Sequence, residues 1–120
     1  MAHAAKVDVQ IKRAYEAASP EDGTRILVDR LWPRGVRKDD AAIDQWMKDV
    51  APSTELRHWF GHDPDRWEEF RHRYKSELAH NAELVNELRT IAKKGRLTLI
   101  YSAHDELHNQ AVVLRDVLAH

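Results

Sequence analysis

The sequence predicts one small α/β domain: a mostly parallel sheet of three to four strands with helices packed against it. Two strand patterns occur early, at residues 7–11 and 25–31, and a third occurs late, at residues 97–101. A long segment of helical pattern separates the second from the third. Parallel strands need a connection of a dozen or more residues, usually helical, so this order favours parallel pairing.

The three strand patterns differ in their expected burial. Val7, Val9 and Ile11 alternate with polar residues, as in a strand with one face in the core, and we expect this strand near an edge. Residues 25–31 and 97–101 are nearly continuous apolar runs, which is typical of strands covered on both faces. We therefore expect the strand at 97–101 to be central.

Five helical segments are predicted from caps and apolar spacing. The first begins at Asp39 or Asp40 and carries Ile43, Trp46, Met47 and Val50. The next begins at Ser53 and ends at Gly61, and a third begins at Asp63 and carries Trp67, Phe70, Tyr74 and Leu78. The fourth covers residues 82–94 before Gly95. The last begins at Asp105 and carries Val112, Leu114, Val117 and Leu118.

Length and composition restrict the function classes. A chain of 120 residues fits a single domain, residues 1–120, in which we expect about residues 1–5 to be a flexible N-terminus. The absence of cysteine excludes thiolate catalysis and disulfides. A formal net charge of -1 provides no global attraction to nucleic acid, so an anion site must be local. Without a secretion signal or a long apolar run, we expect a soluble cytoplasmic protein that does not enter a membrane.

The segment at residues 29–35 is the strongest candidate for a site. It places Arg30, Trp32 and Arg34 directly after a buried apolar run. Arginine suits bidentate capture of carboxylate or phosphate, and tryptophan offers a flat face for stacking. A structural alternative stays open, in which Asp29 pairs with an arginine, Trp32 fills the edge of the core, and Pro33 and Gly35 turn the chain.

A second group of polar residues follows the last strand. Tyr101, Ser102, His104 and Asn109 lie between that strand and the final helix. Ligands of open parallel sheets bind beyond the carboxyl ends of the strands, so we expect this group to share one pocket with the arginines after the second strand. The alternative is that Tyr101 is a core residue, Ser102 a small strand residue, and Asn109 a partner of backbone groups.

The histidines do not predict a metal centre. His58 and His62, and likewise His104 and His108, are four residues apart, but Gly61 interrupts the first pair and neither pair has an evident third ligand. Ser102 and His104 are too close in sequence to imply a catalytic triad. We expect neither a metal nor a cofactor.

Five blocks of sequence resemble the bacterial YeaO-like family, domain of unknown function 488. They are residues 27–35, 51–57, 70–78, 99–103 and 109–114, and together they extend over nearly the whole chain. The resemblance implies a fold more than a function, because the family has no settled biochemical role. It points to Arg30, Trp32, Pro33, Arg34, Arg57, Tyr74, Tyr101, Ser102 and Asn109 as site or framework positions. Some related groups carry a cysteine near the end of the last strand, and its absence here argues against thiol chemistry.

The function predicted first is binding of a small anionic ligand at an Arg- and Trp-lined pocket, with catalysis left open. Arg30, Arg34 and Arg57 would hold the anion, Trp32 would stack on it, and Tyr101, Ser102 or His104 would exchange protons. Two alternatives remain: a nucleic-acid-associated protein using the basic residues 34–38, and a protein-interaction or stress accessory module. The sequence does not determine the oligomeric state.

Overall fold

The fold was analysed in a computed structural model that describes residues 7–119, so the expected flexible N-terminus at residues 1–5 lies outside the described part. Four parallel strands form one sheet in the order β1-β4-β2-β3. Their bounds are Val9–Arg13 (β1), Thr24–Leu27 (β2), Gln45–Trp46 (β3) and Leu97–Tyr101 (β4). The α/β class, the parallel pairing, the central β4 and the edge position of β1 were all predicted from the sequence and are confirmed.

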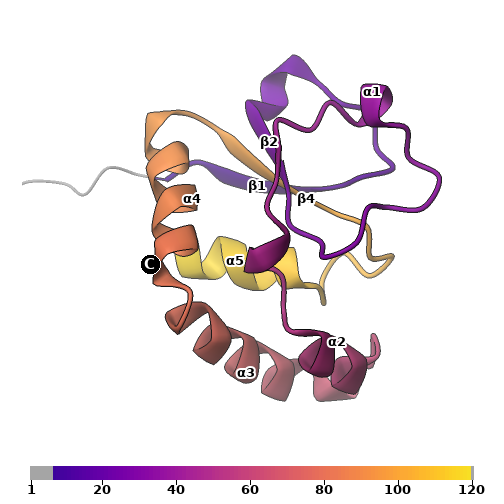
Figure 1. The fold of residues 1–120 in the computed structure, drawn as a ribbon, viewed down its shortest axis with the longest axis vertical. Helices are drawn as coiled ribbons and strands as arrows, with labels where there is room; N and C mark the ends of the chain where they lie inside the picture. Colours follow the sequence, from indigo (N-terminus) through magenta and orange to yellow (C-terminus); the bar gives the residue numbers. More distant parts are fainter. Residues whose placement is uncertain (1–6, 120) are drawn as a thin grey trace, which may run out of the picture.

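The longer helices cover one face of this sheet, and the first, four-residue helix lies in the segment that covers the other face. The helices are α1 (Lys38–Ala41), α2 (Thr54–Phe60), α3 (Trp67–Ala79), α4 (Ala82–Lys94) and α5 (Gln110–Ala119). Helix α5 packs on β1 and β4, while α3 and α4 pack against α5 (Figure 1). Within residues 7–119, no helix is long and apolar enough to cross a membrane.

The sheet has two differently covered faces because successive side chains of a strand point to opposite sides. Leu97, Leu99 and Tyr101 of β4 join the large core beneath the helices. Ile100 and Leu27 point to the other face, where partly buried side chains of residues 32–46 cover them. A loop segment, and not a long helix, therefore closes the second face of the sheet.

The predicted helix at residues 39–50 is wrong. Helix α1 ends at Ala41, Ala42 adopts a left-handed conformation with φ 48°, and the chain then forms the short strand β3. Backbone bonds from Asp44 N to Arg25 O and from Met47 N to Leu27 O attach this segment to β2. The apolar spacing that resembled a helical stripe instead divides its side chains between the two faces of the sheet, with Ile43 and Trp46 on one and Met47 on the other.

The start of the final helix is also wrong. Asn109 caps α5, since its Oδ1 accepts bonds from Ala111 N and Val112 N at 2.9 and 3.2 Å. Asp105 instead closes the preceding turn by accepting from the backbone of Leu107 and His108. The Ser53 cap and the end of α2 at Gly61 are confirmed, as are the predicted bounds at residues 82–94 and 97–101. Strand β2 is shorter than predicted and ends at Leu27.

Candidate functional site

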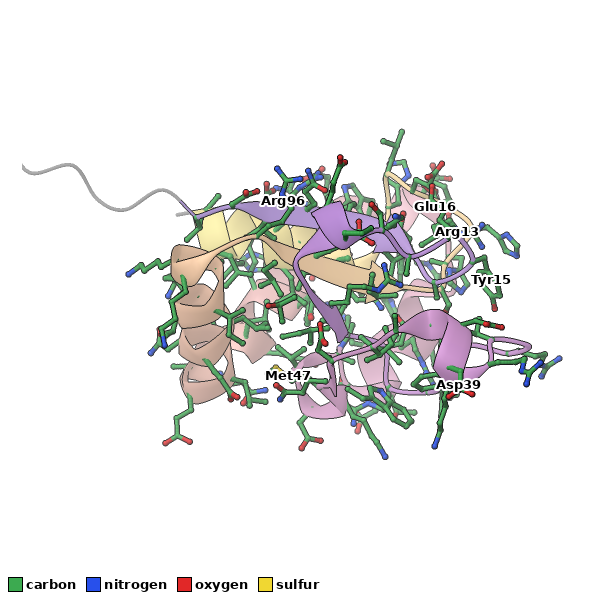
Figure 2. The ribbon with its side chains drawn as sticks, turned by 90° about the horizontal axis from the view of Figure 1, so that it is seen from above. Arg13, Tyr15, Glu16, Asp39, Met47 and Arg96 are labelled. Atoms are coloured by element: carbon green, nitrogen blue, oxygen red, sulfur yellow. The ribbon has the colours of Figure 1, made fainter. Side chains whose placement is uncertain are left out.

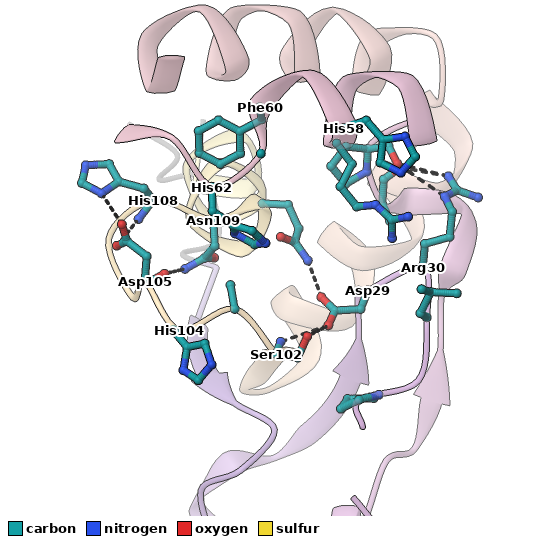
Figure 3. Close-up of a pocket in the computed structure, with 18 of the residues that line it drawn as sticks. Asp29, Arg30, His58, Phe60, His62, Ser102, His104, Asp105, His108 and Asn109 are labelled. Atoms are coloured by element: carbon teal, nitrogen blue, oxygen red, sulfur yellow. Dashed lines mark hydrogen bonds and ion pairs between the residues drawn. The ribbon is translucent and has the colours of Figure 1, made fainter. Parts of the chain in front are cut away.

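A pocket of about 870 Å³ lies beyond the carboxyl ends of β2 and β4. Three segments form most of its wall: residues 29–34 after β2, residues 57–62 at the end of α2, and residues 102–110 after β4. Figure 3 shows Asp29 and Ser102 near the middle of the pocket. Arg30 and His58 lie on one side of this pair, and His104, Asp105 and His108 lie on the other. The predicted meeting of the segments that follow the second and the last strands is thus present.

The parallel pairing of β2 with β4 brings the two loops together. Val28 N still donates to Ile100 O at 3.0 Å, one residue beyond the end of β2. The next residue, Asp29, is held from the opposite side by Trp46, whose indole Nε1 donates to Asp29 O at 2.8 Å. Strand β3 and its tryptophan therefore position the carboxylate at the floor of the pocket.

Asp29 is the most buried charged group of the pocket, with 7% of its surface exposed. Its Oδ2 accepts from Ser102 N at 3.0 Å and from Ser102 Oγ at 2.5 Å, and its Oδ1 accepts from Gln110 Nε2. Burial raises the pKa of Asp29, while these hydrogen bonds and the charge of Arg57 act in the opposite direction. Asp29 pairs with Ser102 and Gln110, so the ion pair with an arginine considered in the structural alternative is absent.

The three predicted arginines all line the pocket but have different surroundings. Arg30 donates to the carbonyl oxygens of Ala51 and Pro52 at 3.3 to 3.4 Å, so it ties the loop after β2 to the start of α2. Arg34 is exposed. Arg57 is half-buried, and no group within residues 7–119 forms a hydrogen bond or an ion pair with its guanidinium.

His104 and His108 line the side of the pocket that lies away from Arg30 (Figure 3). His108 Nδ1 lies 2.8 Å from Asp105 Oδ2, and its ring meets the indole of Trp67 edge-on at 5.2 Å. The hydrogen bond to His108, with backbone N–H groups of the turn, lowers the pKa of Asp105 although desolvation opposes it. His62 follows Gly61 in a second left-handed conformation, with φ 58°, a conformation in which histidine is enriched among residues other than glycine. This turn places Gly61 and His62 in the wall of the pocket.

Two of the predicted site residues lie outside the pocket, and two others line it with their polar groups bound to the backbone. Tyr74 and Tyr101 are 0% and 1% exposed, and both belong to the main core. The Tyr74 hydroxyl donates to Val50 O at 2.6 Å. Trp32 lines the pocket, but its Nε1 donates to Val36 O at 2.7 Å and its ring packs edge-on against Trp46. Asn109 also lines the pocket while acting as a helix cap. These contacts match the structural alternative for Trp32, Tyr101 and Asn109.

Sequence reasoning missed Gln110 and Arg13. Gln110 adjoins the predicted Asn109 and turns toward Asp29 as the first residue of α5. Arg13 ends β1 and donates through Nε to Ala103 O at 2.8 Å and through Nη2 to Ser102 O at 3.3 Å. Figure 2 shows Arg13 and Tyr15 together at this end of the sheet. The position of Arg13 at a strand's carboxyl end was the available signal, because the rule that identified Arg30 applies to every parallel strand.

The predicted absence of a metal centre stays a prediction. In the part of the chain described here, no group of three or more His, Cys, Asp or Glu side chains could hold a metal ion. His104 lies 3.5 Å from Arg13 Nη2, and His108 is paired with Asp105.

Comparison with known proteins identifies the family. Residues 8–120 match the profile described as the "Inactive DUF488-N3 subclade". The chain is 48% identical to "Uncharacterized protein YeaO" of Escherichia coli over 112 residues, covering 93% of this chain and 97% of that protein. It is 44% identical over 110 residues to "Uncharacterized protein Mb3100c" of Mycobacterium bovis, covering 92% of each chain. No solved structure gives a significant match. The chain therefore belongs to the YeaO-like family of domain of unknown function 488.

Proposed function

We propose that the pocket binds a small organic anion. The observation that carries this proposal is Arg57, a half-buried guanidinium in the pocket wall that no group of residues 7–119 pairs. A buried charge is costly unless it is paired and hydrogen-bonded. An anionic ligand would supply both charge and acceptors, and the planar fork of arginine suits carboxylate and phosphate alike.

The charge and size of the pocket support the same conclusion. It is lined by three arginines, Arg30, Arg34 and Arg57, and two carboxyl groups, Asp29 and Asp105, so the formal charges leave one positive charge. Ligand pockets typically have volumes of about 300 to 1,000 Å³, and a volume of about 870 Å³ is far more than a free inorganic anion needs. Apolar side chains such as Phe60 and Phe70 also line it, which suits an organic body.

The surroundings of Ser102 favour binding without catalysis. Its hydroxyl donates to Asp29, and within the described residues no histidine forms a hydrogen bond with it, so it lacks the neutral base that activates a serine nucleophile. The word "Inactive" in the description of the matching family points in the same direction. The nucleic-acid and protein-interaction alternatives do not need a pocket of this size, and we rank them below small-ligand binding.

Titration of organic anions tests the proposal. We would measure the affinities of phenyl phosphate, benzoate and glucose 6-phosphate for the unmodified protein and for Arg57→Ala by calorimetry. We expect at least one of them to bind, and Arg57→Ala to weaken that binding about tenfold or more, since a hydrogen bond to a charged group contributes about 1.5 to 3 kcal/mol.

Arg115→Ala is the matched control, because Arg115 is an exposed arginine of α5 outside the pocket. It should bind the same anion as tightly as the unmodified protein. Equal affinities of the Arg57→Ala and Arg115→Ala variants would refute the role of Arg57, and the absence of binding by all three anions would refute the proposed function.

A further inference from the structure

The floor of the pocket offers hydrogen-bond acceptors to a ligand. An ionised carboxylate can only accept hydrogen bonds, and Asp29 receives three of them on its two oxygens. The single hydroxyl proton of Ser102 is therefore directed at Asp29, 2.5 Å away. What Ser102 Oγ can still offer toward the pocket is a lone pair.

A hydrogen bond to Asp29 also fixes the orientation of the Gln110 amide group. Its Nε2 donates to Asp29 Oδ1, which places the carbonyl oxygen Oε1 at the other corner of the amide group. Within residues 7–119 no donor forms a hydrogen bond with Oε1, and Gln110 lines the pocket. Two acceptors, Ser102 Oγ and Gln110 Oε1, thus accompany the arginines of the same pocket.

We propose that the ligand is a hydroxylated organic anion of the sugar phosphate class. Its anionic group binds Arg57, the unpaired arginine of the pocket wall, and its hydroxyl groups donate to Ser102 Oγ and Gln110 Oε1. This inference rests on the proposed function and specifies the chemistry of the ligand. Hydroxyl groups fit better than ammonium groups, because the pocket already carries one more arginine than carboxylate and repels a second cation.

Asp29 acts as a positioning residue in this arrangement. Replacement of Asp29 by Asn puts an amide in place of the carboxylate. The amide oxygen can keep both bonds from Ser102, while the amide nitrogen faces Gln110 and requires the glutamine side chain to turn over. Gln110 would then present Nε2 to the ligand, so one acceptor of the floor becomes a donor.

The first experiment compares glucose 6-phosphate with phenyl phosphate, which has a ring and a phosphate but no hydroxyl group, and with inorganic phosphate. We expect the unmodified protein to bind glucose 6-phosphate about tenfold or more tightly than either, since a site with unpaired polar groups rejects analogues that leave them unpaired. Binding of phenyl phosphate as tight as that of glucose 6-phosphate overturns the hydroxyl inference and leaves anion binding standing. Binding of none of the three overturns the hydroxyl inference, and it overturns the proposed function too if benzoate also fails to bind.

Variants of Gln110 and Asp29, at the floor of the pocket, then separate hydroxyl binding by the floor from anion binding by the arginines. Gln110→Met keeps the length of the side chain without the acceptor, and should lower the preference for glucose 6-phosphate over phenyl phosphate while leaving the affinity for phenyl phosphate unchanged. Gln10→Met, an exposed glutamine of β1, is the matched control and should retain the full preference. Asp29→Asn should lower the preference less than Gln110→Met does, because a hydroxyl group can also accept a hydrogen bond from the amide nitrogen of Gln110.

If Asp29→Asn does not fold, Gln110→Met decides the question alone, because Gln110 is only partly buried at the start of a helix. A full preference for glucose 6-phosphate in Gln110→Met overturns the assignment of the floor. An equal loss of affinity for phenyl phosphate and for glucose 6-phosphate also contradicts the assignment. Gln110 would then support the anionic group or the fold, and not the hydroxyl groups that phenyl phosphate lacks.

Discussion

Asp29 gives the pocket a measurable pH dependence. Burial raises its pKa above the ordinary value of 3.8, against the effect of its hydrogen bonds and of Arg57. The folded chain therefore holds this proton more tightly than the unfolded chain, and the contribution of Asp29 to the free energy of unfolding falls as the pH rises from 3.8 through the folded pKa. Asp29→Asn lacks this group.

We therefore expect the free energy of unfolding of the unmodified protein, relative to that of Asp29→Asn, to be higher near pH 4 than near pH 7. Urea denaturation of both proteins across this pH range measures the difference between their free energies of unfolding. The contributions of the other titrating groups are common to both proteins and cancel in this difference. A constant difference would show that the hydrogen bonds of Asp29 balance its desolvation, and a difference that grows with rising pH would show that they outweigh it.

Arg30 and Arg34 should respond differently to the same substitution. Arg30→Lys removes the fork that reaches the Ala51 and Pro52 carbonyls, and should cost about 1 kcal/mol of the free energy of unfolding because these are long bonds. Arg34→Lys should leave stability within about 0.5 kcal/mol, as for most exposed positions, yet weaken binding of an organic phosphate. Thermal unfolding and calorimetric titration of both variants check this. Equal destabilisation would place Arg34 in the framework.

At the scale of single residues, the sequence predicts which side chains lie near the pocket, but not whether each of them faces a ligand or the protein itself. The rule that ligands bind beyond strand ends placed Arg30, Arg34 and Ser102 around one pocket. Whether a guanidinium faces a ligand or a backbone carbonyl depends on segments distant in sequence, such as residues 51–52 for Arg30. Tyr74 has a hydroxyl that suits a site, but a core carbonyl lies within its reach.

Among the elements, the start of α2 offers the sharpest test of local structure. Ser53 Oγ accepts from Leu56 N at 3.1 Å and lies 2.6 Å from Glu77 Oε2, so one hydroxyl caps α2 and joins it to α3. Ser53→Ala should lower the free energy of unfolding by about 1 to 2 kcal/mol, as for other N-caps. Thr54→Ala, an exposed neighbour, is the control and should change it by less than about 0.5 kcal/mol. Similar losses in both variants, measured by urea denaturation, would contradict the capping role.

The elements that were predicted correctly are those that local signals determine. Residues 82–94 carry an uninterrupted apolar stripe between Asn81 and Gly95, and residues 97–101 form an apolar run of strand length. The helix predicted at residues 39–50 is wrong because their apolar spacing fits a helix, while pairing with β2 determines their structure. Asp105 and Asn109 are both good caps, and only the packing of α5 on the sheet selects Asn109.

Over the whole molecule, the two faces of the sheet should differ in local stability. All five residues of β4 are buried, and β4 pairs with β1 on one side and β2 on the other. The covering segment at residues 33–44 contains the four-residue α1 and few backbone bonds to the sheet, such as that from Asp44 N to Arg25 O, while the Arg25 side chain adds two bonds to Ala41 O. Segments with few backbone hydrogen bonds open locally at lower free energy than core strands.

We therefore expect hydrogen exchange to distinguish the two regions. The amides of Leu99 and Ile100 should exchange only through global unfolding, whereas those of residues 33–44 should exchange through local opening at much lower free energy. Exchange measured by mass spectrometry at increasing urea concentrations tests this, because global opening depends strongly on urea and local opening does not. Equal protection and equal urea dependence in both regions would show that the covering loop unfolds only with the sheet. If instead the loop opens first, Trp32 loses its hydrogen bond to Val36 O before β4 unfolds, and with it the contact that fixes its ring in the pocket wall. Local opening of the second face would then disrupt the pocket in a chain whose core is still folded.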